Sequence, residues 1–168
     1  MEETRIYLYD ADAGTSHALL LGCARDFAAR IGLTAPHLFL DTLPQGKPYF
    51  PEAPQLCFSV SHSARYWMCA FSQTPVGADI QVRRAAAVAR VIRRWYSARE
   101  IDLVRRSGTE MFFDLWCAKE AYLKYRGCGL GWLRNNVDAA DERGVRTVID
   151  GVRCCRIRLP FDGYAACV

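Results

Sequence analysis

The chain has 168 residues, of which 51% are hydrophobic and 24% are charged, and these fractions exclude a disordered chain. Its formal net charge of +4 is a modest basic excess, which suits an acidic or phosphorylated partner and is weaker than expected of a dedicated DNA-binding domain. The first residues are polar and no apolar run is long enough to span a bilayer, so we expect neither a signal peptide nor a membrane protein.

The first part of the chain predicts a strand, a helix and a loop. Residues 5–9 alternate in polarity and are rich in β-forming side chains, which predicts a strand. Residues 16–31 carry apolar side chains at helical spacing and are followed by Gly32, which predicts a helix ending there. Residues 43–51 hold three prolines and one glycine and therefore predict a loop.

Strands and helices alternate further along the chain. Residues 56–61 and 65–71 predict two strands that turn at Ser63-Ala64, and residues 76–82 predict a third. The remaining elements are helices at 85–95 and at 109–126, the second closed by Gly127 and Gly129, and strand-like runs at 144–149, 152–159 and 163–168, with a hairpin turn at Asp150-Gly151.

These elements indicate the α+β fold class and a weak internal repeat. Each half runs from a strand through a helix to paired strands, and residues 66–70 resemble residues 163–167. We therefore expect one compact unit of two similar halves, residues 1–75 and 76–168, that form an intramolecular pseudo-dimer within a monomer. The eight cysteines lie mostly in apolar runs and form no C-x-x-C pair, which favours free thiols in a reducing cytoplasm.

Two acid-bearing patterns suggest a metal site. In the strand predicted at 76–82, Asp79 and Gln81 share one face, and a hard cation such as Mg²⁺ prefers carboxylate and carbonyl oxygens. In the helix predicted at 109–126, Glu120 and Lys124 are four residues apart and share a face. Taken singly, each pattern is also typical of an ordinary surface strand or of a surface ion pair.

A third pattern is the strand end Phe58-Ser59-Val60-Ser61-His62-Ser63, in which serines alternate with apolar residues before a histidine. Side chains of this kind bind phosphate oxygens, although a strand-end histidine more often bonds to the backbone. The order of Gly46-Lys47-Pro48, the Ser61-His62 segment, Gly77 to Gln81, Trp116 to Lys124 and Gly127 to Leu130 resembles the surfactin-synthetase-type 4′-phosphopantetheinyl transferases over most of the chain.

This resemblance implies a Mg²⁺-dependent transfer of 4′-phosphopantetheine from coenzyme A to a serine of an acyl or peptidyl carrier protein, with release of 3′,5′-ADP. By the same resemblance, Asp79, Glu120 and Gln81 hold the metal, and Glu120 and Lys124 are catalytic. The residues implied to bind coenzyme A are Lys47, Ser61, His62, Lys119 and Lys124.

Two departures from the family pattern are visible. Gln81 stands where many relatives carry a glutamate, which predicts weaker metal binding, and residues 10–16 are short and acidic where relatives carry a basic segment. Arginines between residues 83 and 106, and apolar residues at 95–96 and 111–113, are interpreted as a docking surface for an acidic carrier, or else as ordinary surface and core. Alternatives are a degenerate member that binds coenzyme A or a carrier without catalysis, a member devoted to fatty-acid carrier protein, and, much less favoured, a nucleic-acid-binding protein.

Overall fold

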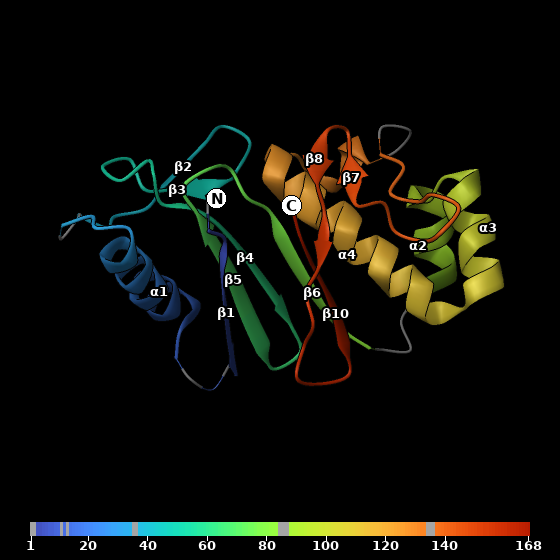
Figure 1. Ribbon diagram of the computed structural model, residues 1–168, viewed down its shortest axis with the longest axis horizontal. Helices are drawn as coiled ribbons and strands as arrows, with labels where there is room; N and C mark the ends of the chain where they lie inside the picture. The colour runs from blue at the N-terminus through green and yellow to red at the C-terminus, as the bar shows by residue number, and fades with distance from the viewer. Residues whose placement is uncertain (1–2, 11, 13, 35–36, 84–87, 134–136) are drawn as a thin grey trace.

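Two three-stranded antiparallel sheets form the centre of the computed structural model, which describes residues 3–10, 12, 14–34, 37–83, 88–133 and 137–168 (Figure 1). The first sheet has the order β1-β5-β4, with β1 at Arg5–Asp10, β4 at Cys57–Ser63 and β5 at Tyr66–Ser72. The second has the order β6-β10-β9, with β6 at Ala78–Val82, β9 at Cys155–Arg156 and β10 at Gly163–Cys167.

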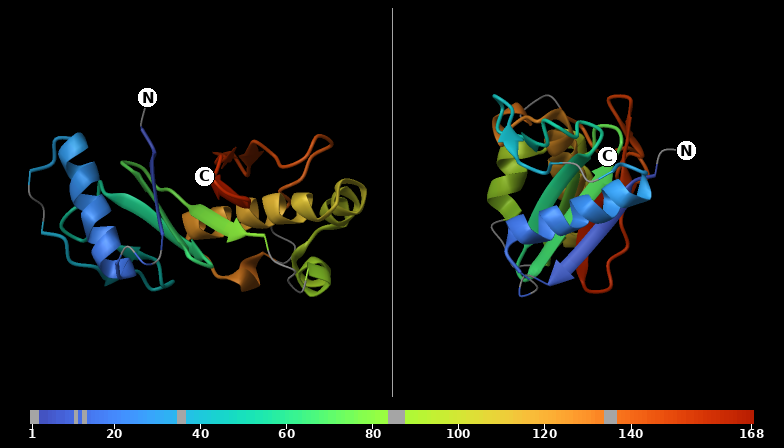
Figure 2. Two further views of the ribbon diagram at one scale, coloured as in Figure 1. Left: turned by 90° about the horizontal axis from the view of Figure 1, so that it is seen from below. Right: turned by 90° about the vertical axis from the view of Figure 1, so that its left-hand side faces the viewer.

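A long helix packs against each sheet. Helix α1 (Ser16–Arg30) buries one face against the first sheet, and α4 (Thr109–Arg126) packs against β6 and β10 of the second. The shorter helices α2 (Val88–Trp95) and α3 (Ala98–Ser107) lie at the end of the molecule opposite α1 (Figure 2). The remaining elements are the hairpin of β2 (Asp41–Thr42) and β3 (Pro48–Tyr49), the hairpin of β7 (Val148–Ile149) and β8 (Val152–Arg153), and a 3₁₀ turn at Leu130–Trp132.

The α+β class is confirmed, and a helix over a three-stranded sheet occurs twice. The predicted boundary between residues 75 and 76 falls in the connection between β5 and β6. The interpretation of the two halves as a pseudo-dimer that arose by duplication stays a prediction. None of the helices in the described ranges is both long and apolar enough to cross a bilayer.

The two sheets meet along β4 and β6 through side chains. Alternation along β4 turns its serines to one face, toward β6, and turns Phe58 and Val60 toward the core under α1. The Oγ atoms of Ser59, Ser61 and Ser63 accept the backbone N–H groups of Ala78, Ile80 and Val82 at 3.0, 3.3 and 2.9 Å. We call these three residues the serine seam; it joins two strands that belong to separate sheets.

The second sheet approaches α4 closely at Gly77. A Cβ atom at this position would lie 2.0 Å from the carbonyl oxygen of Ala121 and 2.4 Å from the backbone nitrogen of Tyr125. Gly77 also exchanges two backbone hydrogen bonds with Val168, at 3.0 and 2.9 Å. The absence of a side chain therefore lets the start of β6 lie directly on the α4 backbone, and this contact sets the distance between strand and helix.

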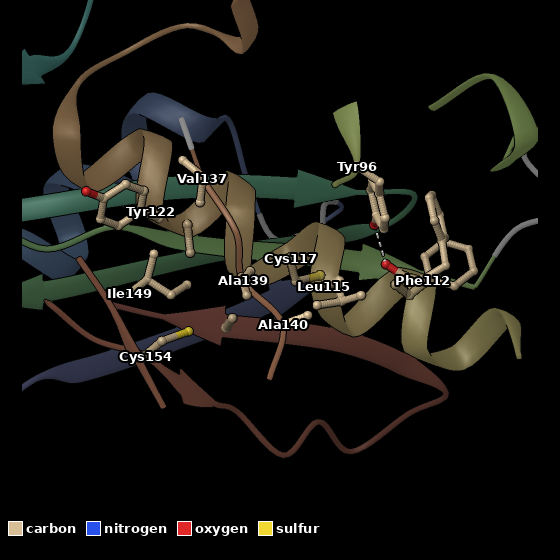
Figure 3. Packing of buried hydrophobic residues seen from close by; sticks show 14 of the residues in the cluster. Tyr96, Phe112, Leu115, Cys117, Tyr122, Val137, Ala139, Ala140, Ile149 and Cys154 are labelled. Carbon is tan, nitrogen blue, oxygen red and sulfur yellow. Dashed lines mark hydrogen bonds between the residues drawn. The ribbon is translucent and has the colours of Figure 1, made fainter. Parts of the chain in front are cut away.

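The largest core lies around α4 (Figure 3). It contains aromatic residues that, from the sequence alone, are interpreted either as a docking surface for the carrier or as core. Tyr96, Phe112 and Phe113 are buried, and the Tyr96 hydroxyl donates a hydrogen bond of 2.7 Å to the carbonyl oxygen of Phe112. Within this core the Tyr96 ring stacks on Phe112, and Phe113 meets Phe112 edge-on, so the three rings are structural. The interpretation of residues 111–113 as a carrier surface is therefore wrong for Phe112 and Phe113.

Most predicted elements are present, with shifted boundaries. The helix at 109–126 has the predicted bounds, and Gly127, in the left-handed conformation with φ of 67°, ends it. The turn between β4 and β5 falls at residues 64–65, one residue later than predicted. Strands predicted at 144–149 and 152–159 are reduced to β7 and β8, which pair around the Asp150-Gly151 turn, and to β9, which pairs with β10. Residues 85–87 of the predicted helix at 85–95 lie outside the described residues.

Helix α3 was not predicted. Its surface is largely charged, and it buries only Glu100, Leu103 and Val104. A capping box starts it: the Ser97 side chain accepts from the backbone of Glu100, and the Glu100 carboxylate accepts from the Ser97 backbone. This Ser-x-x-Glu spacing was the sequence pattern that could have predicted the start of α3.

We predict that Gly77→Ala lowers the free energy of unfolding by about 2–4 kcal/mol, because the added methyl group would overlap the α4 backbone. The measurement is urea denaturation followed by circular dichroism. Gly22→Ala is the matched control: in α1 its Cβ would meet no atom within 4 Å, so this change should stabilise by about 0.5–1 kcal/mol. Equal small effects of both changes would contradict the close contact.

Candidate active site

Asp79 is the buried centre of a polar cluster between β6 and α4. Strand alternation sends Ala78 and Ile80 into the core between the sheets and turns Asp79 to the other face, where it is 2% exposed. Its Oδ1 atom accepts hydrogen bonds of 2.7 Å from Ser61 Oγ and 2.7 Å from Lys124 Nζ. Its Oδ2 atom accepts one of 3.1 Å from Gln81 Nε2.

Glu120 supplies the second carboxylate of this cluster, from α4. Burial raises the pKa of Glu120 to about 7, and the negative charge of Asp79 adds to the increase, while Lys124 acts in the opposite direction. A carboxyl group with this pKa exchanges its proton readily near neutral pH, as a general base requires. The arrangement brings Asp79 and Glu120 together as the sequence predicted.

Lys124 provides the positive charge at this point. It lies one helical turn after Glu120 and forms an ion pair with Asp79, its side chain being 30% exposed. The partly exposed side chain also lines the cleft beside the cluster. The sequence predicted that Lys124 shares a helix face with Glu120, and its ion pair with Asp79 is an additional finding.

The donor set fits a divalent cation. The negative charge of Asp79 raises the cost of ionising Glu120, and a cation placed between the two side chains would offset that cost. The hydrogen bond from Gln81 Nε2 to Asp79 leaves the amide oxygen of Gln81 free for a ligand. Within the described ranges no group of three or more His, Cys, Asp or Glu side chains could hold a metal, so the ligands predicted here are two carboxylates and one amide.

Lys47 lines a cleft beside the cluster. Its Nζ atom donates hydrogen bonds of 3.1 Å to the carbonyl oxygens of both Val76 and Tyr125, and burial lowers its pKa. The cleft has a volume of about 240 Å³ and is also lined by Phe58, by Lys124 and by the turn after α4. An adjoining apolar hollow of about 290 Å³ shares Lys47 and Phe58 with it, so the two together offer space for an extended ligand.

Ser61 and His62 lie on opposite faces of β4. Ser61 is buried in the serine seam and bonds to Asp79, whereas His62 is exposed on the face that carries Val60. The structure thus brings Ser61, and not His62, to the acidic cluster. The contact of His62 with the nucleotide stays a prediction.

Lys119 is separated from the cluster although it precedes Glu120 in the sequence. Its ammonium group is fully buried and pairs with the fully buried Glu100 carboxylate at 2.8 and 2.7 Å, and it also donates to the carbonyl oxygen of Val137. Burial lowers the pKa of Lys119, and Glu100 acts in the opposite direction. With its donors occupied in this way, Lys119 does not fit the predicted contact with phosphate; it ties α4 to α3.

Two residues of this region were not singled out from the sequence. Glu100 is the partner of Lys119, and its Oε1 atom also accepts the backbone N–H of Ala139 at 2.8 Å. Cys117 lies one turn before Glu120, donates to the carbonyl oxygen of Tyr164 at 3.3 Å, and has a raised pKa through burial and through the neighbouring Asp79. Cys117 therefore fills the apolar base of the site as a neutral thiol.

The family model of the 4′-phosphopantetheinyl transferase superfamily matches residues 75–158, which include both carboxylates. A 4′-phosphopantetheinyl transferase of Bacillus subtilis is 32% identical over 173 residues, covering 99% of this chain and 71% of the relative. The chain therefore belongs to the 4′-phosphopantetheinyl transferase superfamily.

Other relatives are longer than this chain. The 4′-phosphopantetheinyl transferase Sfp of Bacillus subtilis strain 168 is 32% identical over 136 residues, which cover 77% of this chain and 59% of that protein. The 4′-phosphopantetheinyl transferase gsp of Aneurinibacillus migulanus is 31% identical over 108 residues, which cover 62% of this chain and 44% of that protein. These relatives are transferases of one type, and the aligned segments span about half of their length.

We predict that Lys119→Met lowers the free energy of unfolding by about 3–5 kcal/mol, because it leaves the buried Glu100 carboxylate without its counter-ion. Urea denaturation measures the loss. Arg106→Met is the matched control, since Arg106 forms an exposed ion pair with Asp102 in α3 and its removal should cost less than about 1 kcal/mol. If Lys119→Met lowered the free energy of unfolding no more than Arg106→Met does, the structural role of the buried ion pair would be refuted.

We further predict that Glu120→Gln stabilises the metal-free protein at alkaline pH. The pKa of Glu120 in the fold, about 7, lies above the ordinary 4.5, so the wild type loses stability as pH rises from about 4.5 to 7, and the glutamine variant does not. The variant should be more stable by on the order of 1–3 kcal/mol at pH 8, a range lowered for partial exposure, and near wild type at pH 4.

Chemical denaturation in EDTA at the two pH values checks this difference. Glu110→Gln, an exposed change in the first turn of the same helix, is the control. A stability difference for Glu120→Gln that does not grow with pH would show that this carboxyl group is not the one with the raised pKa.

Proposed function

We propose that this chain, a transferase by family, moves 4′-phosphopantetheine from coenzyme A to a serine hydroxyl of an acyl or peptidyl carrier protein. The observation that carries this proposal is the pairing of a buried aspartate with a glutamate of pKa about 7, beside a lysine and a cleft. Paired acidic groups and a lysine at a cleft suit the transfer of a phosphoryl-type group, in which positioning and charge compensation dominate.

In this proposal Glu120 is the general base. Its carboxylate takes the proton of the carrier serine, the serine oxygen forms a bond to the β-phosphorus of coenzyme A, and the bond from that phosphorus to the bridging oxygen breaks. The electron pair of that bond leaves with 3′,5′-ADP. Lys124, whose side chain is partly exposed, compensates the charge that develops on the leaving phosphate.

Asp79, Glu120 and the amide oxygen of Gln81 would hold Mg²⁺, which when bound neutralises pyrophosphate charge. An amide brings no charge, so we expect a weaker metal site than one with three carboxylates. The cleft beside Lys47 would receive the nucleotide of coenzyme A, with the adjoining apolar hollow extending it. Lys47 and Lys124, both members of the predicted coenzyme A set, line this cleft.

The proposed carrier partner is acidic, and the surface beside α2 suits it. Arg90, Arg93 and Arg94 are exposed on this helix, and a hollow of about 450 Å³ next to it is lined by Arg93, Arg94 and Arg146. Positive charges of this kind accelerate the approach of an acidic protein. We place the reaction in the cytoplasm, consistent with eight free cysteines, and propose a monomer, because one chain contains both sheets and both carboxylates.

The test is intact-protein mass spectrometry of an apo carrier protein incubated with this chain, coenzyme A and Mg²⁺. We expect a gain of about 340 Da, one phosphopantetheine group, that is lost with EDTA. Glu120→Gln should be at least about 100-fold slower, because the general base is gone, whereas Glu110→Gln should keep the wild-type rate. No gain on several unrelated carriers would favour the degenerate member that binds without catalysis.

A further inference from the structure

The geometry points to Ser61 as a positioning residue for the Asp79 carboxylate, and we propose this role in place of a contact with the nucleotide. Ser61 is 4% exposed and sits in the middle of the serine seam. Its Oγ atom lies 2.7 Å from Asp79 Oδ1 and accepts the N–H of Ile80 at 3.3 Å. The inference deepens the proposed function and rests on it, since it concerns how the same site binds its cation.

The hydroxyl group of Ser61 donates its hydrogen bond to Asp79. A hydroxyl group has a single proton, and Asp79, when ionised, only accepts hydrogen bonds, so the short contact between the two requires Ser61 to donate. The neighbouring seam residues differ in this respect. Ser59 directs its hydroxyl to the carbonyl oxygen of Ala78, and the hydroxyl of Ser63 accepts the N–H of Val82. Ser61 alone among the seam serines bonds to a carboxylate.

This contact holds the carboxylate from β4, whereas Lys124 reaches the same oxygen from α4. Backbone atoms of β4 and β6 hold Ser61, because its oxygen also accepts the Ile80 amide, and a serine has only one side-chain torsion to its oxygen. Lys124, the other donor to Oδ1, has a long and partly exposed side chain. When Lys124 turns to an incoming phosphate, Ser61 keeps Asp79 oriented, and as a neutral donor it does not repel a cation.

The test uses Mn²⁺ as the probe, titrated into the protein without coenzyme A, with free Mn²⁺ measured by electron paramagnetic resonance. We expect Ser61→Ala to raise the Kd for Mn²⁺ about tenfold, as the loss of a partner that orients a ligand does. Ser61→Thr keeps the hydroxyl and should bind Mn²⁺ nearly as the wild type does. Ser63→Ala is the matched control: it removes an equivalent seam bond without touching Asp79 and should change the Kd less than about twofold.

Other outcomes overturn the proposal in distinguishable ways. Equal effects of Ser61→Ala and Ser63→Ala on the Kd for Mn²⁺ would show that Ser61 only joins the two strands. An unchanged Kd for Mn²⁺ together with a raised KM for coenzyme A would show that Ser61 contacts the nucleotide instead. If Ser61→Ala does not fold by circular dichroism, Ser61→Cys, similar in size but a weak donor, replaces it. Wild-type protein that binds no Mn²⁺ overturns this inference and the metal site together, whereas binding without transfer overturns the proposed reaction alone.

Discussion

The hydrogen bonds between serine hydroxyls of β4 and backbone amides of β6 are the constraint on which the rest of the structure depends. Each sheet is completed by its own ladder and its own helix, and the seam places β6 beside β4 at a constant offset of 19 residues. On its other side, β6 touches the α4 backbone through Gly77. Asp79 is therefore held between a strand of one half and a helix of the other, and its distance from Glu120 follows from these two contacts.

The two lysines of α4 have different roles because the helical period places them on different faces. Lys124 lies on the face of the acidic cluster, where its ammonium offsets the cost of keeping two carboxylates close together. Lys119 lies on another face and forms a buried ion pair with Glu100 inside the core. A buried pair of this kind contributes little net stability but is costly to break, so it fixes the position of α3 against α4. Rigid placement of α4 in turn keeps Glu120 beside β6.

Local patterns determined how far the sequence could predict this structure. The C-terminal bound of α4 was predicted because Gly127 and Gly129 close the helix, and the Asp79–Glu120 pairing followed from motifs in a known order. Helix α3 was missed because its surface is charged and its signal was a cap. The position of Lys119 could not be predicted, since its partner lies 19 residues away and the helix rotates adjacent residues onto different faces.

The serine seam has a consequence for how this fold changes over evolutionary time. A backbone ladder survives nearly every substitution, because all residues except proline bring their own amide. The seam instead depends on one hydroxyl group per rung, so a change in a single codon can remove a rung while both sheets keep their internal pairing. The joint between the halves can thus drift in small steps, and the placement of the acidic pair can be adjusted without refolding either half.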